Sequence, residues 1–240
     1  MIVLLNRSGQ TCNQLFSIAT TLSRANEENC KAICPIVDKN LMSSFSFLCD
    51  EKVIIKSNDL LFAISKLIVI FKSINFFNTK IITRWIESVE IETAKRNKDY
   101  VLNHILYKDE DIKKAQYFFE RYELNPKKTI AVHIRRGDYK EFEGGKYYYS
   151  DSDYIKWIAD MYKQDKNISF ILFSNEKIII DHYSEYPCFI TDSEVTVDLL
   201  IMSMCRQIIG PPSTFSLWAN YTGDNILTVL SNKDQIVKIG

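Results

Sequence analysis

The chain has 240 residues, of which 46% are hydrophobic and 25% are charged, so it can bury a sizeable core and lacks the composition of a disordered protein. Its 30 basic residues are balanced by 30 acidic ones, which excludes the broad positive field of sequence-independent nucleic-acid binding and predicts no nucleic-acid partner. The 6 cysteines form no Cys-x-x-Cys pair, so we interpret them as reduced core residues rather than zinc ligands.

Predicted strands and helices alternate along the first part of the chain. The sequence indicates a short buried strand at 1–5, a helix over 13–29 and a second strand at 31–37, which is a βαβ start. From 75 to 108 the pattern fits a helix and a strand equally well, and no element is assigned there. The helix over 13–29 carries apolar residues at the spacing of one helical face: Leu15, Ile18, Ala19 and Leu22.

The most apolar stretch runs from Leu60 to Phe77. Lys66 and Lys72 interrupt it before the ~20 apolar residues that a membrane span requires, so we expect a buried helix, with contact to a membrane surface or a lipid-linked substrate as the alternative. The N-terminal segment MIVLLNRSGQ has too short an apolar run for a signal peptide and no basic residue before it. We therefore expect a cytoplasmic protein, with membrane association as the alternative.

The second half of the chain predicts a doubly wound sheet. An amphipathic helical pattern ends before Pro126, and we place a domain boundary near 125. The predicted fold class is therefore α/β, with two Rossmann-like parallel-sheet domains at 1–125 and 126–240. The elements expected after the boundary are strand 129–134, helix 151–164, strand 168–174, a helix, strand 188–191, helix 196–206, strand 207–210, helix 213–222 and strand 225–230.

Polar loops follow three of the predicted strands, at 6–14, 135–145 and 210–216. In open α/β sheets, ligands bind beyond the carboxyl ends of the strands, where the strand order reverses. We therefore expect these loops to meet and to form a ligand site.

The segment AVHIRRGDYK places two arginines directly after an apolar run. An arginine fork matches phosphate oxygens and keeps its charge at any relevant pH, so Arg135 and Arg136 are candidate diphosphate ligands. Asp138 could orient the fork or accept a proton. The alternative is a surface loop in which arginine and aspartate pair with each other.

The segment GPPSTFS predicts a helix start that suits a phosphate, with simple helix capping as the alternative. Its hydroxyls come from Ser213, Thr214 and Ser216. His133 alternates with apolar neighbours in its strand, so we expect it to face the opposite side of the sheet, as a hydrogen-bonded structural residue or as a base.

Asp151 and Asp153 have the Asp-x-Asp spacing with which metal-dependent glycosyltransferases hold a nucleotide through a divalent cation. They also begin an amphipathic helix, where aspartates are expected as caps, and we favour capping. The sequence has no P-loop, no G-x-G-x-x-G and no G-x-S-x-G motif.

Three segments resemble, in order and spacing, the α-1,2-fucosyltransferase family and its relatives that make α-1,6 and protein O-fucose linkages: HIRRGDY, GQTCNQLFSIATTLSRA and DLLIMSMCRQIIGPPSTFSLWA. The resemblance implies a GT-B-like architecture, in which two Rossmann-like domains face a cleft. It implies an inverting transfer from GDP-L-fucose without a metal or other cofactor. It also implies donor binding by residues 126–240, an acceptor-side domain at 1–125, and an oligosaccharide or a lipid-linked glycan as acceptor.

The resemblance also assigns roles to matching positions. Arg135 would hold the β-phosphate, with Arg136 supporting it, while His133 and Asp198 would face the guanine. Further donor contacts would come from Ser213, Thr214, Ser216 and Asn13. The acceptor hydroxyl needs a base, and the nearby carboxylates are Asp138, Glu141 and Glu143. The residues expected to be catalytic are Arg135, Asp138, Glu143 and Asn13.

Two motifs depart from the family pattern. Gly-Gly-Leu-Gly-Asn-Gln is replaced by Gly-Gln-Thr-Cys-Asn-Gln at 9–14, so two glycines that permit close backbone approach are absent. Phe-Ser-Asp-Asp is replaced by Phe-Ser-Asn-Glu at 173–176. The lost glycines leave open a non-catalytic glycan- or nucleotide-binding protein on the same scaffold. The Asp-x-Asp spacing leaves open a metal-dependent transferase that uses Asp151 and Asp153.

Overall fold

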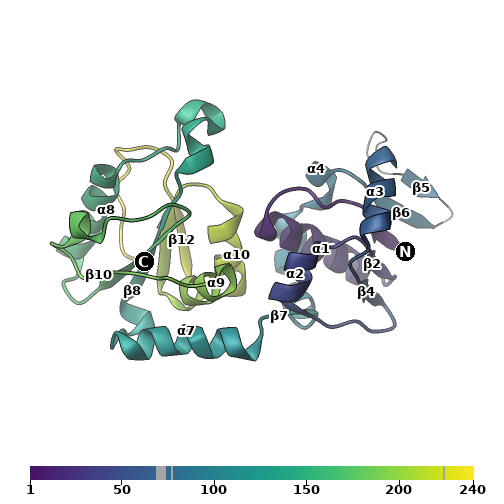
Figure 1. The fold of residues 1–240 in the computed structure, drawn as a ribbon, viewed down its shortest axis with the longest axis horizontal. Helices are drawn as coiled ribbons and strands as arrows, with labels where there is room; N and C mark the ends of the chain where they lie inside the picture. The colour runs from purple at the N-terminus through teal and green to yellow at the C-terminus, as the bar shows by residue number, and fades with distance from the viewer. Residues whose placement is uncertain (69–73, 77, 224) are drawn as a thin grey trace. The chain divides into compact units, whose positions relative to one another are not determined.

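The computed structural model describes residues 1–68, 74–76, 78–223 and 225–240. They form two compact units, Met1–Asp109 and Glu110–Gly240, each built around its own sheet (Figure 1). The division falls at the start of helix α7 (Asp109–Arg121), earlier than the boundary expected near 125. α7 belongs to unit 2 because Tyr122, directly after it, places its ring 5.3 Å from the ring of Phe189 in that unit.

Unit 1 contains a mostly parallel sheet. Its strands are β1 (Ile2–Leu4), β2 (Ala32–Cys34), β4 (Val53–Ile55), β5 (Ile74–Phe76) and β6 (Thr79–Ile82). Their order is β4-β2-β1-β6-β5, and β5 alone in this sheet runs antiparallel to its neighbour. The order reverses between β1 and β6. A separate antiparallel pair joins β3 (Ser46–Phe47) to β7 (Ile105–Leu106).

Helix α1 (Thr11–Glu27) packs its apolar stripe on this sheet, and the four residues predicted to form that stripe are buried. Its other side makes polar contacts with residues 88–97. Ser17 Oγ lies 2.9 Å from Ser88 Oγ, and Arg24 pairs with Glu90 at 3.1 Å. These contacts hold short helices that carry no regular apolar pattern. The other helices of unit 1 are α2 (Lys39–Ser44), α3 (Asp59–Ile68), α4 (Trp85–Ser88), α5 (Ile91–Arg96) and α6 (Lys98–Leu102).

The stretch expected as a buried helix over 60–77 is helical where α3 (Asp59–Ile68) covers it, but the expected burial is wrong there. Leu60 and Ile64 on α3 are 74% and 47% exposed. Residues 69–73 and Phe77 lie outside the described residues. Polar contacts hold the first turn of α3, because Arg7 pairs with Asp59 at 3.0 Å. Within the described ranges, no helix combines the length and the apolar character needed to cross a membrane.

Unit 2 contains the parallel sheet that the sequence predicts. Its strands are β8 (Thr129–Ile134), β9 (Ser169–Ser174), β10 (Cys188–Ile190), β11 (Gln207–Gly210) and β12 (Ile226–Val229). Their order is β10-β9-β8-β11-β12, with every neighbouring pair parallel. This is a Rossmann-like order, which reverses between β8 and β11. The predicted α/β fold class is confirmed.

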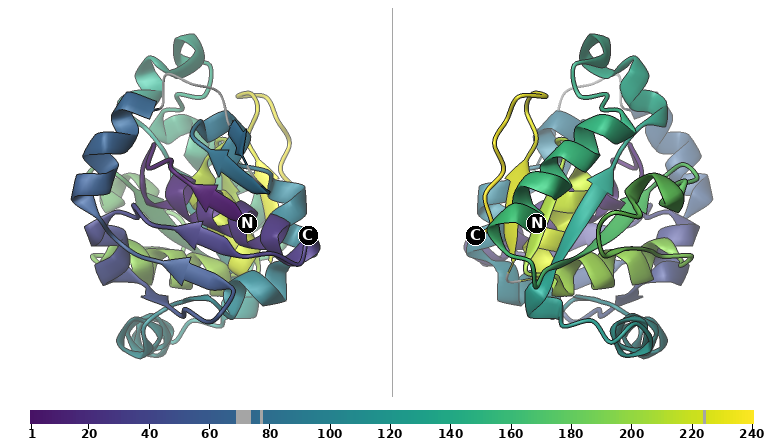
Figure 2. Two further views of the ribbon diagram at one scale, coloured as in Figure 1. Left: turned by 90° about the vertical axis from the view of Figure 1, so that its right-hand side faces the viewer. Right: turned by 90° about the vertical axis from the view of Figure 1, so that its left-hand side faces the viewer.

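Helices cover both faces of the unit 2 sheet (Figure 2). Helix α8 (Asp151–Gln164) buries Tyr154 and Trp157 in one core with Val132 of β8. On the other face, α10 (Thr214–Thr222) packs beside α9 (Val195–Met204). The 3₁₀ turns of this unit are η1 (Pro126–Lys128), η2 (Gly137–Lys140), η3 (Phe142–Gly145) and η4 (Ile180–Tyr183).

The helix expected between the strands at 168–174 and 188–191 is wrong, since only η4 forms there. The run Ile178–Ile180 is β-branched and disfavours a helix. The cysteines are free, as predicted. Cys12, Cys34 and Cys205 are buried, whereas the exposed Cys49 does not belong to the core.

Candidate functional site

The carboxyl edge of the unit 2 sheet brings together the loops that follow its strands. Because β8 to β11 are parallel, the loops after these strands leave from the same edge. The loops after β8 and β11 flank the reversal of strand order, which is the usual ligand site of such sheets. These are two of the three polar loops identified in the sequence.

Arg135 is the first residue after β8, and its side chain is only 15% exposed. It pairs with Asp138 at 3.0 Å, and its guanidinium carbon lies 5.6 Å from the ring centre of Tyr139. Asp138 is 58% exposed, so solvent weakens this ion pair. An incoming phosphate can therefore replace the aspartate on a guanidinium that the ring already orients.

Tyr139 joins the loop after β8 to the loop after β11. Its hydroxyl donates to the backbone carbonyl of Pro212, and the residue is buried. Burial raises the pKa of Tyr139, so the hydroxyl remains a donor at physiological pH. The predicted meeting of these two loops is confirmed, and it depends on Tyr139, which was not among the predicted site residues.

His133 lies on β8 and faces α10, opposite to Val132, as its alternation predicts. Its Nδ1 lies 2.6 Å from Oγ of Ser216, and both residues are buried. Burial and the nearby Arg135 lower the pKa of His133 to about 3, so the imidazole is neutral. A Cβ on Gly210 would lie 2.8 Å from Cβ of His133, so this approach requires glycine. Nucleotide contacts from His133 and Ser216 stay predictions, since here the two side chains face each other.

The N-terminus of α10 lies at the same edge of the sheet. Ser213 caps it, because its Oγ accepts a hydrogen bond of 3.2 Å from the backbone N–H of Phe215. The capping alternative is thus correct for Ser213. Thr214 is the first helical residue and is partly exposed. A capped helix start still presents its positive dipole end to an anion.

Arg136 binds two residues near the start of helix α8. Its Nε donates to the carbonyl of Tyr149 at 3.2 Å, and its terminal nitrogen pairs with Asp151. Asp151 also accepts from the Tyr183 hydroxyl at 2.8 Å and lies 2.7 Å from Nδ1 of His182. Burial acts to raise the pKa of Asp151, but the hydrogen bonds from its three partners outweigh burial and lower it to about 2. Neither Tyr183 nor His182 was identified from the sequence.

Asp153 forms the capping box of helix α8 with Ser150, as the sequence favoured, whereas the cap expected from Asp151 is wrong because its carboxylate binds Arg136, Tyr183 and His182 instead. Oγ of Ser150 accepts from the N–H of Asp153 at 3.3 Å, and the Asp153 carboxylate accepts from the N–H of Ser150 at 2.8 Å. The two carboxylates of the Asp-x-Asp segment therefore contact different partners. In the described part of the chain, no group of three or more His, Cys, Asp or Glu side chains is arranged to hold a metal ion.

The loop after β9 supports the backbone of the loop after β8. Oε1 of Glu176 accepts from the N–H of Gly137 at 3.0 Å, and Oδ1 of Asn175 accepts from the N–H of Arg136 at 3.4 Å. Gly137 has a φ of 48°, which favours glycine. The residues that replace the family's two aspartates therefore orient the arginine loop.

Asp198 lies in the first turn of α9, after β10. Burial raises its pKa to about 6 and outweighs a hydrogen bond with the Thr191 side chain, while among the described residues its Oδ1 is a buried oxygen with no hydrogen-bond partner. A buried carboxyl oxygen without a partner costs stability unless a ligand supplies a donor. Asp198 is thus an acceptor available at the predicted nucleotide edge.

The other predicted carboxylates lie on the exposed part of the loop after β8. Glu141 and Glu143 are exposed, and Glu143 has a φ of 47°, an uncommon value for a residue with a Cβ. Gly144 and Gly145 follow with φ values of 69° and 78°. The base therefore stays a prediction, with Asp138, Glu141 and Glu143 as the candidates on one loop.

Asn13 belongs to unit 1, in the first turn of α1. Its side chain lies against Gly9, where an added Cβ would come 2.3 Å from Nδ2 of Asn13. Gly9 has a φ of 82°, so this turn requires glycine even though Gln10 and Cys12 replace the other glycines of the family pattern. The contact between Asn13 and the donor stays a prediction.

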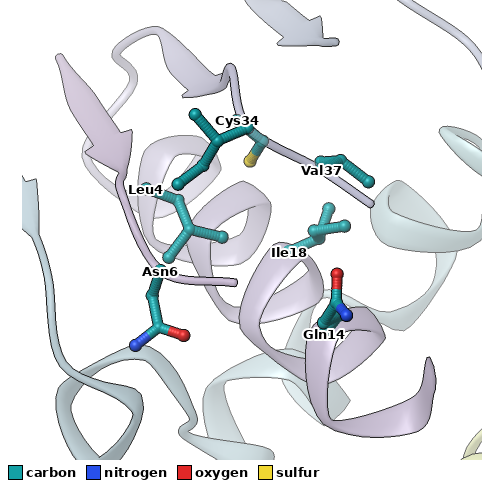
Figure 3. A pocket seen from close by; sticks show the side chains of 7 residues that line it. Leu4, Asn6, Gln14, Ile18, Cys34 and Val37 are labelled. Carbon is teal, nitrogen blue, oxygen red and sulfur yellow. The ribbon is translucent and has the colours of Figure 1, made fainter. Parts of the chain in front are cut away.

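A small pocket lies at the carboxyl ends of β1 and β2 (Figure 3). Its empty space is about 200 Å³, including the part open to solvent. It is lined by Leu4, Asn6, Gln14, Ile18, Cys34, Ile36 and Val37.

Solved structures with the same fold include fucosyltransferases. The chain is similar to the NodZ α-1,6-fucosyltransferase co-crystallised with GDP, with a TM-score of 0.59 and 15% identity over 91% of each chain. NodZ from Bradyrhizobium gives a TM-score of 0.57 with the same identity and coverage. POFUT1 in complex with GDP-fucose gives a TM-score of 0.61 and 12% identity, over 100% of this chain and 97% of that one. At these identities the likeness establishes the fold.

No curated protein matches the chain by sequence. The sequence model of glycosyl transferase family 11 matches residues 92–236, which is more than half of the chain. This match confirms the family resemblance found in the sequence. The chain belongs to glycosyl transferase family 11.

Proposed function

We propose that this glycosyltransferase moves L-fucose from GDP-L-fucose to a hydroxyl of a glycan acceptor, with inversion and without a metal. Family membership supports sugar transfer. The donor is supported by proteins with the same fold, which are fucosyltransferases solved with GDP or GDP-fucose. The observation that carries the proposal is Arg135, held over Tyr139 at the reversal of the unit 2 sheet.

The diphosphate would bind between Arg135 and the N-terminus of α10. Phosphate oxygens would replace Asp138 on the guanidinium, because the Arg135–Asp138 pair is exposed on its carboxylate side. Ser213 and Thr214 would add hydroxyls at the helix start. Arg136 would support this site without contacting the phosphate, since its nitrogens already bind Tyr149 and Asp151.

The guanine would bind Asp198. Its Oδ1 accepts no hydrogen bond from the described residues, and guanine offers N1–H and N2–H₂ donors to a carboxylate. The neutral His133 would complete the base site from β8.

During transfer, the bond from the fucose anomeric carbon to the diphosphate oxygen breaks, and its electron pair leaves on GDP. The acceptor oxygen forms the new bond on the opposite face and gives its proton to a carboxylate base. Arg135 and the dipole of α10 stabilise the growing charge on the diphosphate. Asp138 is a candidate base once phosphate has displaced it from Arg135, and Glu141 and Glu143 are the others.

Substitution of Arg135 tests the proposal directly. Arg135→Ala should lower kcat/KM for GDP-L-fucose hydrolysis or transfer by about 10²–10³-fold, the usual effect of removing one charge-stabilising donor. Arg121→Ala, which removes an exposed arginine from α7, is the matched control and should retain activity. Full activity in Arg135→Ala would contradict the proposal.

A non-catalytic binding protein is the second candidate, favoured by Gln10 and Cys12 in place of glycines. It predicts GDP binding without turnover on any acceptor. For the active enzyme we propose a cytoplasmic location and an oligosaccharide or lipid-linked acceptor. The exposed Leu60 and Ile64 of α3 are the residues with which to test peripheral membrane contact.

A further inference from the structure

The loop that carries the candidate bases is tied at its two ends. Residues 137–148 leave the sheet after β8 and return to the start of α8. Arg136 precedes this loop and Tyr149 follows it. The carboxylates Asp138, Glu141 and Glu143 all lie between them.

One guanidinium connects these ends. Nε of Arg136 donates to the carbonyl of Tyr149 at 3.2 Å, and its terminal nitrogen pairs with Asp151, so both partners lie beyond the far end of the loop. The Arg136 side chain is 19% exposed, which limits its screening by solvent. A planar fork with several donors can make both bonds at once.

Asp151 is itself fixed from a third segment. Oδ1 of Asp151, which accepts from Arg136, also accepts from the hydroxyl of Tyr183 at 2.8 Å. Oδ2 lies 2.7 Å from Nδ1 of His182. Tyr183 is fully buried, so the position of the carboxylate is set by η4 as well as by α8.

Asp151 has no capping role that would explain this arrangement. Ser150 and Asp153 form the capping box of α8, whereas the Asp151 carboxylate binds three side chains. The two aspartates thus carry the same charge in the same helical turn and differ in their partners.

We propose that Asp151 is a positioning residue of the transferase: it holds Arg136 across the ends of the 137–148 loop and thereby places the candidate bases. The catalytic part of this proposal rests on the proposed function. The part that concerns the loop does not.

Two substitutions and one matched control test the proposal in the full-length chain. Asp151→Asn and Arg136→Lys should each expose the loop, and Asp153→Asn is the control that removes the neighbouring charge. Trypsin cleavage after the exposed Lys140 and Lys146, followed by mass spectrometry, reports loop opening without any substrate. Because cleavage follows local opening, we expect it to accelerate about tenfold in the first two variants and to stay near the wild-type rate in the control.

The kinetic constants should separate the variants in the same way. Misplaced catalytic groups lower turnover by up to about 10²-fold, so kcat should fall in Asp151→Asn. The affinity for GDP, measured by calorimetry, should stay near the wild-type value because Arg135 is unchanged. The double variant Asp151→Asn/Arg136→Lys should be no worse than the more damaging of the two single variants, since both substitutions break the Arg136–Asp151 pair. Tyr183→Phe removes one bond to Asp151 and should give a weaker form of the same result, which also serves if Asp151→Asn fails to fold.

The proposal is overturned if Asp151→Asn and Asp153→Asn have the same cleavage rate and the same kcat, or if the effects of Asp151→Asn and Arg136→Lys add. Full activity of Arg135→Ala would instead overturn the proposed function. In that case the trypsin comparison would still decide whether Asp151 holds the loop.

Discussion

The charged Asp198 side chain lowers the stability of the fold but offers an acceptor to a bound nucleotide. Its pKa of about 6 lies above the ordinary aspartate value near 4, so the folded chain holds this proton more tightly than the unfolded chain does. The stability that Asp198 contributes in its neutral form is therefore present at low pH and is lost as the pH rises through about 6.

Because the pKa of Asp198 is raised in the folded state, we predict that Asp198→Asn stabilises the ligand-free protein at neutral pH. An amide avoids burying the charge, so at pH 7.5 the free energy of unfolding should increase by about 1–3 kcal/mol, and the gain should shrink below pH 5. Urea unfolding at both pH values measures the difference. A variant that is equally destabilised at both would show that burial of the charged carboxylate does not cost the fold stability.

The same substitution should weaken the binding of the nucleotide. A carboxylate accepts both guanine donors, whereas an amide oxygen is uncharged, and hydrogen bonds to charged groups contribute about 1.5–3 kcal/mol. We therefore expect GDP affinity to fall about tenfold or more in Asp198→Asn. In the wild type, affinity should rise between pH 5 and 7 as the carboxyl ionises. Inosine diphosphate, which lacks the 2-amino group, is the control ligand, and unchanged GDP binding by the variant would remove Asp198 from the base site.

The individual site residues could be predicted from the sequence only where local pattern determines them. Arg135 follows an apolar strand, and His133 alternates within it, so their edge and face were predictable. Tyr183 could not be paired with Asp151, nor Tyr139 with Pro212, because each contact joins segments more than 30 residues apart in the sequence.

Helix α8 depends on its capping box. Ser150→Ala removes the side-chain acceptor for the N–H of Asp153, and losing such a cap costs about 0.5–2 kcal/mol. We predict a lower unfolding temperature, with GDP affinity close to the wild-type value. Thermal unfolding and calorimetry measure the two quantities. A large loss of affinity would mean that the cap also shapes the nucleotide site.

Helices and strands that are stabilised by apolar burial could be predicted from the sequence, whereas helices that are held by polar contacts could not. Strand β8 and helix α1 are stabilised by apolar burial, and their periodicity identified them. The segment 83–103 forms three short helices held to α1 by polar contacts, which leave no periodic signal. Helix α3 shows the opposite error, because its apolar composition predicted burial while its first turn is held by Arg7.

At the scale of the whole chain, the two units repeat one arrangement. In each unit the strand order reverses beside its first strand, β1 or β8, and a polar loop follows that strand. The two parallel-sheet units were therefore predictable from the alternation of strands and helices. The cleft between them and the division of donor and acceptor roles stay predictions.

The two-unit enzyme should work without a divalent cation. A leaving diphosphate needs positive charge, and a bound metal or a fixed guanidinium can supply it. In the Asp-x-Asp segment, Asp151 already binds the cationic Arg136 and Asp153 caps α8, so a second cation placed there would face a guanidinium. We predict that EDTA leaves the transfer rate unchanged and that added Mg²⁺ does not raise it, as measured by GDP release. Raised salt should weaken GDP binding, because Arg135 acts through charge at a partly exposed site. Activity lost in EDTA and restored by Mg²⁺ would instead favour the metal-dependent transferase.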